Sequence, residues 1–324
     1  MSKPKVLVTR EIPSPGIELL KTECDVEINP EDRALTREEL LKGVVNKDAV
    51  LCLLTDRIDG EFFDAAPELK GVANYAVGFD NMDVPEATKR GIPLSNTPDV
   101  LTEATAEMAW ALLFSVARRI VESDMFLRSG EWDGWGPLQY VGRAVSGKTL
   151  GIVGPGRIGS SMALMSKGFN MKVLYSGNRK NPLLDNELGA EFVPFTKLVR
   201  ESDFISLHVP FWAETKHMFS ASVFKDMKKS SIIINTARGA VIKEDDLLEA
   251  LTTGEIAGAG LDVYEFEPAV TEKLKILNNV VLTPHTGSGT IKSREAMSIM
   301  AAENILAMLK GEKSRQCINP EIFE

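Results

Sequence analysis

The chain has 324 residues, of which 44% are hydrophobic, and carries a formal net charge of −9. One hydrophobic core rarely serves so many residues, so we expect two domains. The acidic charge argues against a nucleic-acid partner, and no apolar run approaches the ~20 residues of a membrane span. No apolar leader follows Met1, so we expect a cytoplasmic protein. Three distant cysteines (Cys24, Cys52, Cys317) predict neither a disulfide framework nor a metal site.

The first part of the chain alternates apolar runs with amphipathic stretches of helical length. The runs are KVLVTR at 5–10, AVLCLLT at 49–55 and GVANYAVG at 71–78. This alternation predicts an α/β domain with a parallel sheet. We assign residues 1–100 to it, and also residues 290–324, because the amphipathic helix predicted at 293–311 is expected to return to this domain.

Residues 101–132 are predicted to be helical and apolar on more than one side. Few polar residues interrupt the succession of Met108, Ala109, Leu112, Leu113 and Val116. A helix that is apolar all round is buried on all sides. We predict that it connects the two domains and forms the main contact of a homodimer. The alternative is an ordinary core helix of a monomer.

Residues 149–159 read TLGIVGPGRIG, a short apolar run followed by three glycines spaced G-x-G-x-x-G and then by a helical pattern. This pattern predicts a dinucleotide site. Gly154 permits the tight turn, Gly156 lets the backbone approach the pyrophosphate, and Gly159 lets helix and strand pack closely. The fingerprint normally follows the first strand of its own sheet, so residues 101–289 are predicted to form a second, dinucleotide-binding domain.

The next predicted strand, at 171–176, ends without the acidic residue that usually binds the adenosine ribose. Gly177, Asn178, Arg179 and Lys180 stand there instead. A carboxylate would repel a 2′-phosphate, whereas an Arg fork suits one. We therefore favour NADP(H) as the cofactor over NAD(H), which stays possible. The alternative is that the two cations belong to a solvated loop.

Four further strands are predicted, each ending in polar residues. They lie at 204–210, 231–239, 258–268 and 280–289. Ligands of parallel sheets bind at the carboxyl ends of the strands, so these endings should converge. Arg238, Glu267 and His285 lie there, and each could be structural if taken singly. Together they supply an anion anchor, a carboxylate and a proton carrier active near neutral pH.

The chain resembles the D-isomer-specific 2-hydroxyacid dehydrogenases over nearly its full length, and is most similar to the glyoxylate/hydroxypyruvate reductase branch. The matching segments are NYAVGFDNMDVPEATKRGI (74–92), TPDVLTEATAEMAWALL (97–113), TLGIVGPGRIG (149–159), INTARGAVI (234–242), GAGLDVYEFEP (258–268) and LTPHTGSGT (282–290). The resemblance implies an α/β protein with two doubly wound parallel-sheet domains. The first would be a flavodoxin-like substrate domain and the second a Rossmann cofactor domain.

The resemblance also implies roles for the site residues. Arg238 would bind the carboxylate and carbonyl oxygen of a small 2-oxo acid. His285 would donate the proton and Glu267 would pair with it. From the other domain, the backbone of Val77 and Gly78 would cradle the carboxylate, and Leu53 would close over it.

Asp262 is expected to face the nicotinamide amide, and Thr105 to approach the cofactor. Further cofactor contacts are expected from Arg157, Ile158, His208, Val209, Pro210, Thr215, Thr236, Ala237 and Gly287.

The branch rests on the stretch EWDGWGPLQYVG at 131–142, in which Trp135 would reach the neighbouring subunit's active site. The alternative is that Trp132 and Trp135 simply bury ring area at a dimer contact. Asn178 departs from the branch, where an Arg commonly follows the strand. The expected reaction is reduction of glyoxylate or hydroxypyruvate with NADPH. A 2-ketogluconate reductase, a D-lactate or 3-phosphoglycerate dehydrogenase, and a dinucleotide-sensing corepressor are the alternatives.

Overall fold

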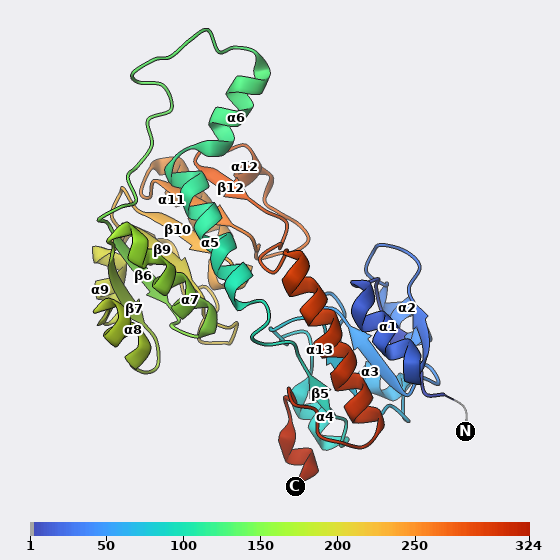
Figure 1. The fold of residues 1–324 in the computed structure, drawn as a ribbon. Helices are drawn as coiled ribbons and strands as arrows, with labels where there is room; N and C mark the ends of the chain where they lie inside the picture. Colours follow the sequence, from blue (N-terminus) through green and yellow to red (C-terminus); the bar gives the residue numbers. More distant parts are fainter. Residues whose placement is uncertain (1–2) are drawn as a thin grey trace. The chain divides into compact units, whose positions relative to one another are not determined.

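The computed structural model describes residues 3–324, which form two compact units (Figure 1). The first unit contains the described residues up to Leu101 together with Gly289–Glu324, and the second contains Thr102–Ser288. The chain therefore passes between the units twice.

The first unit is built on a five-stranded parallel sheet with strand order β2-β1-β3-β4-β5. Its strands are β1 (Lys5–Val8), β2 (Asp25–Ile28), β3 (Ala49–Cys52), β4 (Val72–Asn74) and β5 (Leu94–Ser95). Neither β2 nor β5 was predicted from the sequence. The β2 strand alternates polar and apolar residues at the sheet edge, and β5 is only two residues long, so neither is an apolar run.

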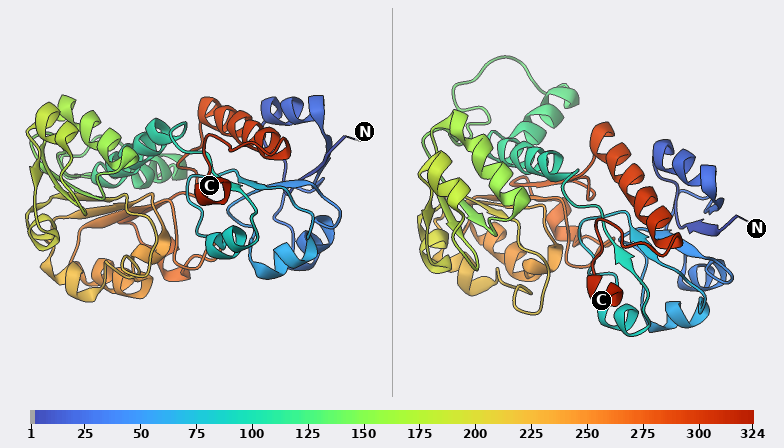
Figure 2. Two further views of the ribbon diagram at one scale, coloured as in Figure 1. Left: turned by 90° about the horizontal axis from the view of Figure 1, so that it is seen from below. Right: turned by 60° about the horizontal axis from the view of Figure 1, so that its bottom comes forward.

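Helices cover both faces of this sheet (Figure 2). They are α1 (Ser14–Glu23), α2 (Arg37–Gly43), α3 (Gly60–Ala65), α4 (Val84–Lys89), α13 (Ile291–Leu309) and the 3₁₀ helix η3 (Pro320–Phe323). As predicted, the last long helix returns to this unit, where α13 packs along α1. Gly16 allows this close approach, because a β-carbon there would lie 2.1 Å from the Ser298 carbonyl oxygen.

The second unit contains a seven-stranded parallel sheet with strand order β12-β11-β10-β9-β6-β7-β8. Its strands are β6 (Thr149–Val153), β7 (Lys172–Ser176), β8 (Glu191–Phe192), β9 (Phe204–Leu207), β10 (Ile232–Asn235), β11 (Gly258–Leu261) and β12 (Val280–Leu282). The strand order reverses at β6, which lies between β7 and β9. Such a switch point is where doubly wound sheets bind ligands.

Two apolar clusters, one on each face, hold this sheet. In β10, Ile232 and Ile234 pack with α5 and α7, whereas Ile233 packs on the opposite face with α11. The helices are α5 (Thr102–Ala117), α6 (Ile120–Ser129), α7 (Arg157–Met165), η1 (Ser166–Phe169), α8 (Pro182–Leu188), α9 (Phe195–Glu201), α10 (Ala221–Asp226), η2 (Gly239–Val241), α11 (Glu244–Thr253) and α12 (Glu272–Lys275). The predicted fold class, two parallel-sheet α/β units, is confirmed.

The prediction of one long helix at 101–132 is wrong. Arg119 adopts a left-handed conformation (φ 54°, ψ 40°), so α5 ends at Ala117 and α6 begins at Ile120. The α5 helix is buried within its own unit, against α7 and the strands β10 and β11. The α6 helix contains no buried residue. Neither Gly nor Pro marks the break in the sequence.

Neither a membrane span, a metal site nor a disulfide framework was expected from the sequence. None of the helices in residues 3–324 is long and apolar enough to cross a membrane. Within the same range, no group of three or more His, Cys, Asp or Glu residues is arranged to hold a metal ion. Cys24, Cys52 and Cys317 are free thiols.

Candidate functional site

The glycine loop follows β6, at the switch point of the second sheet. A β-carbon on Gly154 (φ 91°) would lie 2.8 Å from the His208 carbonyl carbon, and one on Gly159 would lie 2.3 Å from the Gly154 carbonyl oxygen. Both contacts are with backbone. A β-carbon on Gly156 would meet nothing within 4 Å. Gly156 therefore leaves open space in front of α7.

The amino end of α7 fits a phosphate. The helix begins at Arg157 and no side chain caps its first turn, so backbone N–H groups remain for a ligand. Ile158, the second residue, is half-buried. This arrangement of free N–H groups, positive helix end and open space at Gly156 is suited to the pyrophosphate of a dinucleotide.

The segment after β9 packs against the glycine loop. Burial lowers the pKa of His208 to about 3, so its imidazole is neutral near pH 7. The Ser206 hydroxyl lies 2.8 Å from His208 Nε2. His208 thus adds no positive charge to the pyrophosphate region. Val209 is half-buried and Pro210 exposed.

Thr215 shapes the loop that follows. Its hydroxyl donates a hydrogen bond to the Pro210 carbonyl (2.8 Å) and accepts one from the Trp212 N–H (2.8 Å). Thr215 is an expected cofactor contact, but its hydroxyl is therefore hydrogen-bonded within the loop.

Asn178, Arg179 and Lys180 are exposed in the loop after β7. Within residues 3–324, Arg179 and Lys180 have no ion-pair partner. A β-carbon on Gly177 would lie 2.6 Å from the Pro155 side chain. Asn181 donates to the Pro155 carbonyl at 3.0 Å, which holds this cationic loop against the glycine loop.

The loop after β10 carries Arg238. Asn235, the fully buried last residue of β10, accepts from the Ala237 N–H (3.0 Å) and donates to the Arg238 carbonyl (2.9 Å). The Arg238 guanidinium donates to the Ala237 carbonyl at 2.8 Å. The buried Thr236 hydroxyl has no hydrogen-bond partner in the described part of the chain. A buried hydroxyl left in this state is suited to a bound ligand.

Glu267 and His285 form a pair between the ends of β11 and β12. Glu267 Oε2 lies 2.9 Å from His285 Nδ1, and Oε1 accepts from the Tyr264 N–H at 2.9 Å. Burial raises the pKa of Glu267, but the hydrogen bond and charge of His285, the Tyr264 N–H and the charge of Arg238 outweigh it, so the pKa lies below its ordinary value. With Nδ1 occupied, Nε2 of His285 remains for chemistry.

Asp262 organises the turn that carries His285. Oδ1 of this buried carboxylate accepts from Thr283 Oγ1 (2.6 Å) and Thr286 N (2.8 Å), and Oδ2 accepts from Gly287 N (2.7 Å). The Asp262 carbonyl also accepts from the His285 N–H at 2.9 Å. His285 itself has a left-handed φ of 54°. The turn is therefore wrapped around a carboxylate that the sequence analysis connected only with the cofactor.

Thr105, in the first turn of α5, lies beside the same turn. A β-carbon on Gly287 would lie 3.1 Å from Asp262 Oδ2 and 3.3 Å from Thr105 Cγ2. The structure thus brings together Thr105, Asp262 and Gly287, all expected to contact the cofactor.

In the first unit, amide side chains bring together the loops that carry Leu53, Val77 and Gly78. Asn81 donates to the Leu53 carbonyl (3.1 Å), and the buried Asn74 donates to the Gly78 carbonyl (2.9 Å) and to Asn81 Oδ1 (3.1 Å). Leu53, Val77 and Gly78 are each partly exposed. The sequence analysis missed both asparagines. Asn74 and Asn235 are both polar residues at the end of an apolar strand. This pattern could have identified Asn74 in the sequence.

A buried acid, Asp56, completes this edge. Its Oδ2 accepts from Thr9 Oγ1 (2.5 Å) and from the Leu53 N–H (2.8 Å). Burial raises the pKa of Asp56, and these two hydrogen bonds only partly offset the shift. The predicted substrate-facing edge of the first unit is thus built on hydrogen bonds from amide, hydroxyl and backbone groups.

The α6 helix and the loop after it extend from the second unit (Figure 1). Trp135, which lies in this loop, is 84% exposed. Other large apolar side chains are exposed in the same segment: Ile120, Val121, Met125, Leu127, Trp132, Leu138 and Val141.

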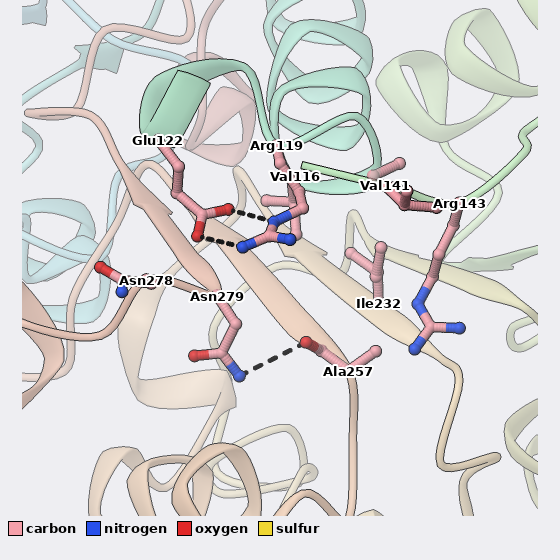
Figure 3. Close-up of a pocket in the computed structure, with 11 residues that line it drawn as sticks. Val116, Arg119, Glu122, Val141, Arg143, Ile232, Ala257, Asn278 and Asn279 are labelled. Atoms are coloured by element: carbon pink, nitrogen blue, oxygen red, sulfur yellow. Dashed lines mark hydrogen bonds and ion pairs between the residues drawn. The ribbon is translucent and has the colours of Figure 1, made fainter. Parts of the chain in front are cut away.

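A cavity of about 480 Å³ lies at the amino end of the second sheet, near Ile232 and Ala257 (Figure 3). Arg119 pairs there with Glu122 at 2.8 Å, and Arg143 approaches from the opposite wall. This cavity lies at the strand ends opposite those that carry Arg238 and Gly154, so it is separate from the candidate site.

Comparisons with known proteins give consistent matches, of which the relatives and solved structures cover nearly the whole chain. The family model described as D-isomer specific 2-hydroxyacid dehydrogenase, NAD binding domain, matches residues 110–287. A glyoxylate reductase of Thermococcus onnurineus is 50% identical over 99% of this chain and 97% of that protein. The crystal structure of the TT0316 protein of Thermus thermophilus is similar with a TM-score of 0.91 at 40% identity, covering 97% of this chain and 99% of that chain. That of an NADPH-dependent glyoxylate/hydroxypyruvate reductase of Sinorhizobium meliloti, in complex with NADP and malonate, has a TM-score of 0.86 at 31% identity, covering 98% and 97%.

Proposed function

Since the chain belongs to the D-isomer specific 2-hydroxyacid dehydrogenase family, we propose that it reduces glyoxylate and hydroxypyruvate to 2-hydroxy acids with NADPH. The observation that carries this proposal is the 2.9 Å pair of Glu267 and His285, beside the positive charge of Arg238. Reduction of a 2-oxo acid needs an anion anchor and a proton donor at one place. These three side chains supply both.

The proposed roles follow from charge. The Arg238 guanidinium binds the substrate carboxylate and stabilises the negative charge that develops on the carbonyl oxygen. His285 donates the proton from Nε2 to that oxygen, while Glu267 holds Nδ1 and stabilises the protonated ring before transfer. When bound, the reduced nicotinamide supplies the hydride to the carbonyl carbon. Leu53, Val77 and Gly78 are proposed to contact the substrate carboxylate.

The cofactor is proposed to bind along the carboxyl edge of the second sheet. Gly154, Gly156 and Gly159 with the amino end of α7 would hold the pyrophosphate. Thr105, Asp262, Thr236 and Gly287 would lie nearer the nicotinamide. The preference for NADPH rests on Arg179 and Lys180, two cations without an ion-pair partner in residues 3–324, in a loop fixed to the glycine loop by Asn181.

We further propose a homodimer. The support is the set of exposed apolar side chains on α6 and its following loop, next to the cavity bordered by Arg119 and Arg143. A second copy would cover this surface, and Trp135 would reach the partner's substrate site. Light scattering should give twice the chain mass, and Trp135→Ser should raise KM for the oxoacid without changing cofactor affinity.

The first test is the initial rate of NADPH and NADH oxidation with glyoxylate, hydroxypyruvate, pyruvate and 2-ketogluconate in turn. Fast NADPH-dependent turnover of the first two would support the substrate and the cofactor assignments. Faster turnover of pyruvate or 2-ketogluconate would contradict the proposed substrates and assign another activity of the family to the chain. A preference for NADH would overturn the reading of residues 178–180.

A further inference from the structure

A second histidine–carboxylate pair lies in the second unit. His217 Nε2 is 2.5 Å from Glu265 Oε1. Because an ionised carboxylate only accepts hydrogen bonds, Nε2 is the donor. The side chain of Glu265 is 11% exposed and that of His217 is 32% exposed. Neither residue has a role in the proposed reaction.

Glu265 is connected in turn to Glu244, a buried residue that begins α11. Glu244 Oε2 accepts from the Glu265 N–H (3.1 Å), and Glu265 Oε2 accepts from the Glu244 N–H (2.9 Å). Glu244 Oε1 accepts from the Thr271 N–H at 3.1 Å. Only 3% of Glu244 is exposed, so its carboxylate is shielded from water and its hydrogen bonds are strengthened by the low local dielectric. They fasten residues 265–271, which include Glu267, to the start of α11.

His217 fastens the same segment to the loop that carries Arg238. The His217 N–H donates to the Ala240 carbonyl at 2.8 Å, two residues after Arg238. Gly239 lies directly on the other segment, because a β-carbon there would be 1.8 Å from the Tyr264 carbonyl carbon. His217 therefore joins two segments that are already in contact, through its backbone N–H to Ala240 and its imidazole to Glu265.

We propose that His217, Glu265 and Glu244 form a positioning cluster, which fixes the loop of Arg238 relative to the segment of Glu267. The proposal rests on the proposed function, in which Arg238 anchors the substrate and Glu267 orients His285. The cluster would touch neither substrate nor cofactor. Its effect would be on geometry, and displacement of a reacting group by about 1 Å can lower a rate by about 10²-fold.

The kinetic test compares His217→Ala with His217→Gln. The Gln side chain can place an N–H donor close to the position of Nε2, whereas Ala removes the donor. We expect kcat/KM for the oxoacid to fall by about 10- to 10²-fold in His217→Ala and to stay within a few-fold of wild type in His217→Gln. The cofactor dissociation constant should stay unchanged in both.

The matched control is Asp246→Asn. Asp246 lies in the first turn of α11, as Glu244 does, but it binds Lys243 and the Ala221 N–H instead of the Glu267 segment. We expect this variant to keep its kcat/KM. Equal losses in Asp246→Asn and His217→Ala would mean that only the stability of α11 matters, and the proposal would be wrong.

An NMR measurement, which needs no turnover, tests the positioning cluster independently of the proposed function. The chain has three histidines, so their ring-nitrogen NMR signals can be assigned in cofactor-free protein. The Nδ1 signal of His285 should shift in His217→Ala, because its hydrogen bond with Glu267 is loosened, and should stay in place in Asp246→Asn. An unchanged His285 signal in folded His217→Ala would overturn the proposal.

If His217→Ala does not fold, Glu265→Gln replaces it, because the single amide oxygen cannot take the positions of both carboxylate oxygens, one of which binds His217 and the other the Glu244 N–H. The same shift of the His285 signal is then expected. A wild-type protein that turns over no oxoacid would refute the proposed function, and the NMR comparison would still decide on the cluster.

Discussion

The carboxyl edges of the two parallel sheets are built from different chemistry. In the first unit, Asn74 and Asn81 hold the loops of Leu53 and Gly78 through amide hydrogen bonds to backbone carbonyls. In the second unit, the corresponding edge carries the ionisable groups Glu267 and His285. The same architecture therefore presents a surface shaped by amide hydrogen bonds in one unit and a histidine–carboxylate pair in the other.

The acids at the two edges show this difference most directly. The pKa of Asp56 in the first unit is raised by burial. The pKa of Glu267 in the second is also pushed up by burial, but His285, the Tyr264 N–H and Arg238 together bring it below its ordinary value. The hydrogen bonds and positive charges around Glu267, which Asp56 lacks in part, decide the direction of each shift. The following experiments test whether the reaction depends on the charged edge more than on the hydrogen-bonded one.

The largest effect is expected for His285→Ala. Loss of a positioned proton donor should lower kcat by on the order of 10²- to 10⁴-fold, with little change in the cofactor dissociation constant. Steady-state rates and a fluorescence titration with NADPH measure the two quantities. Added imidazole should restore part of the rate. Undiminished turnover would remove His285 from the mechanism.

The second largest effect is expected for Asp262→Asn, which should lower kcat/KM by about 10²-fold. One amide oxygen cannot replace both carboxylate oxygens, so the turn would misplace His285. The pattern of the loss is informative. If NADPH affinity fell and kcat did not, Asp262 would act through the cofactor alone. Thr283→Val, which removes only one of the hydrogen bonds, should give a smaller loss of the same kind.

The double variant Arg179→Ala, Lys180→Ala should weaken NADPH binding by about 10- to 10²-fold, which corresponds to the loss of charge-assisted hydrogen bonds. NADH binding should not change. Lys172→Ala, at the other end of β7 and paired with Glu191, is the control. An equal loss for both dinucleotides would assign these cations to general charge attraction.

A smaller effect is expected at the hydrogen-bonded edge. Asn81→Ala removes one hydrogen bond to the Leu53 carbonyl and one to the Asp56 carbonyl, so it should lower the free energy of unfolding by about 1–3 kcal/mol. KM for the oxoacid should rise by up to about tenfold, with kcat nearly unchanged. Asn319→Ala, at the buried amino end of β5, should cost similar stability and leave KM alone. A fall in kcat as large as that of His285→Ala would mean that the reaction depends on both edges equally.

The smallest effect concerns pH and stability. The raised pKa of Asp56 stabilises the fold below its ordinary value of 3.8, and this contribution is lost as the pH rises through the folded-state pKa. The lowered pKa of Glu267 stabilises the fold above 4.5, and this contribution is lost as the pH falls through the folded-state pKa. Relative to wild type, the Tm of Asp56→Asn should therefore rise with increasing pH, and that of Glu267→Gln should rise with decreasing pH. Parallel curves would contradict both shifts.

The sequence predicted features that are local. The alternating apolar runs indicated most strands of both sheets, and the glycine spacing indicated the turn after β6, because Gly154 and Gly159 are fixed by contacts within a few residues or with the neighbouring strand. The edge strands β2 and β8 escaped because their exposed residues interrupt the apolar pattern. The break at Arg119 escaped because a left-handed arginine has no sequence signature.

Hydrogen bonds between distant segments could not be predicted. His217 and Glu265 are 48 residues apart, and Asp262 reaches a turn 21 to 25 residues further along the chain. Glu267 and His285 were expected to converge because both follow predicted strands, and the family resemblance implied that they pair. No rule of spacing connects such residues, because the register of the neighbouring loops decides which polar atoms meet.

The atoms that a β-carbon would meet at Gly154, Gly159 and Gly177 determine which substitutions each loop of the second unit can accept. Gly154 and Gly159 face backbone atoms, so no second substitution elsewhere can make room for a side chain there. Gly177 faces only the Pro155 side chain, so a paired exchange of these two residues can open the loop of Arg179. The turn that contains Gly154 and Gly159 is thus fixed in sequence, whereas coupled substitutions can change the adjoining loop.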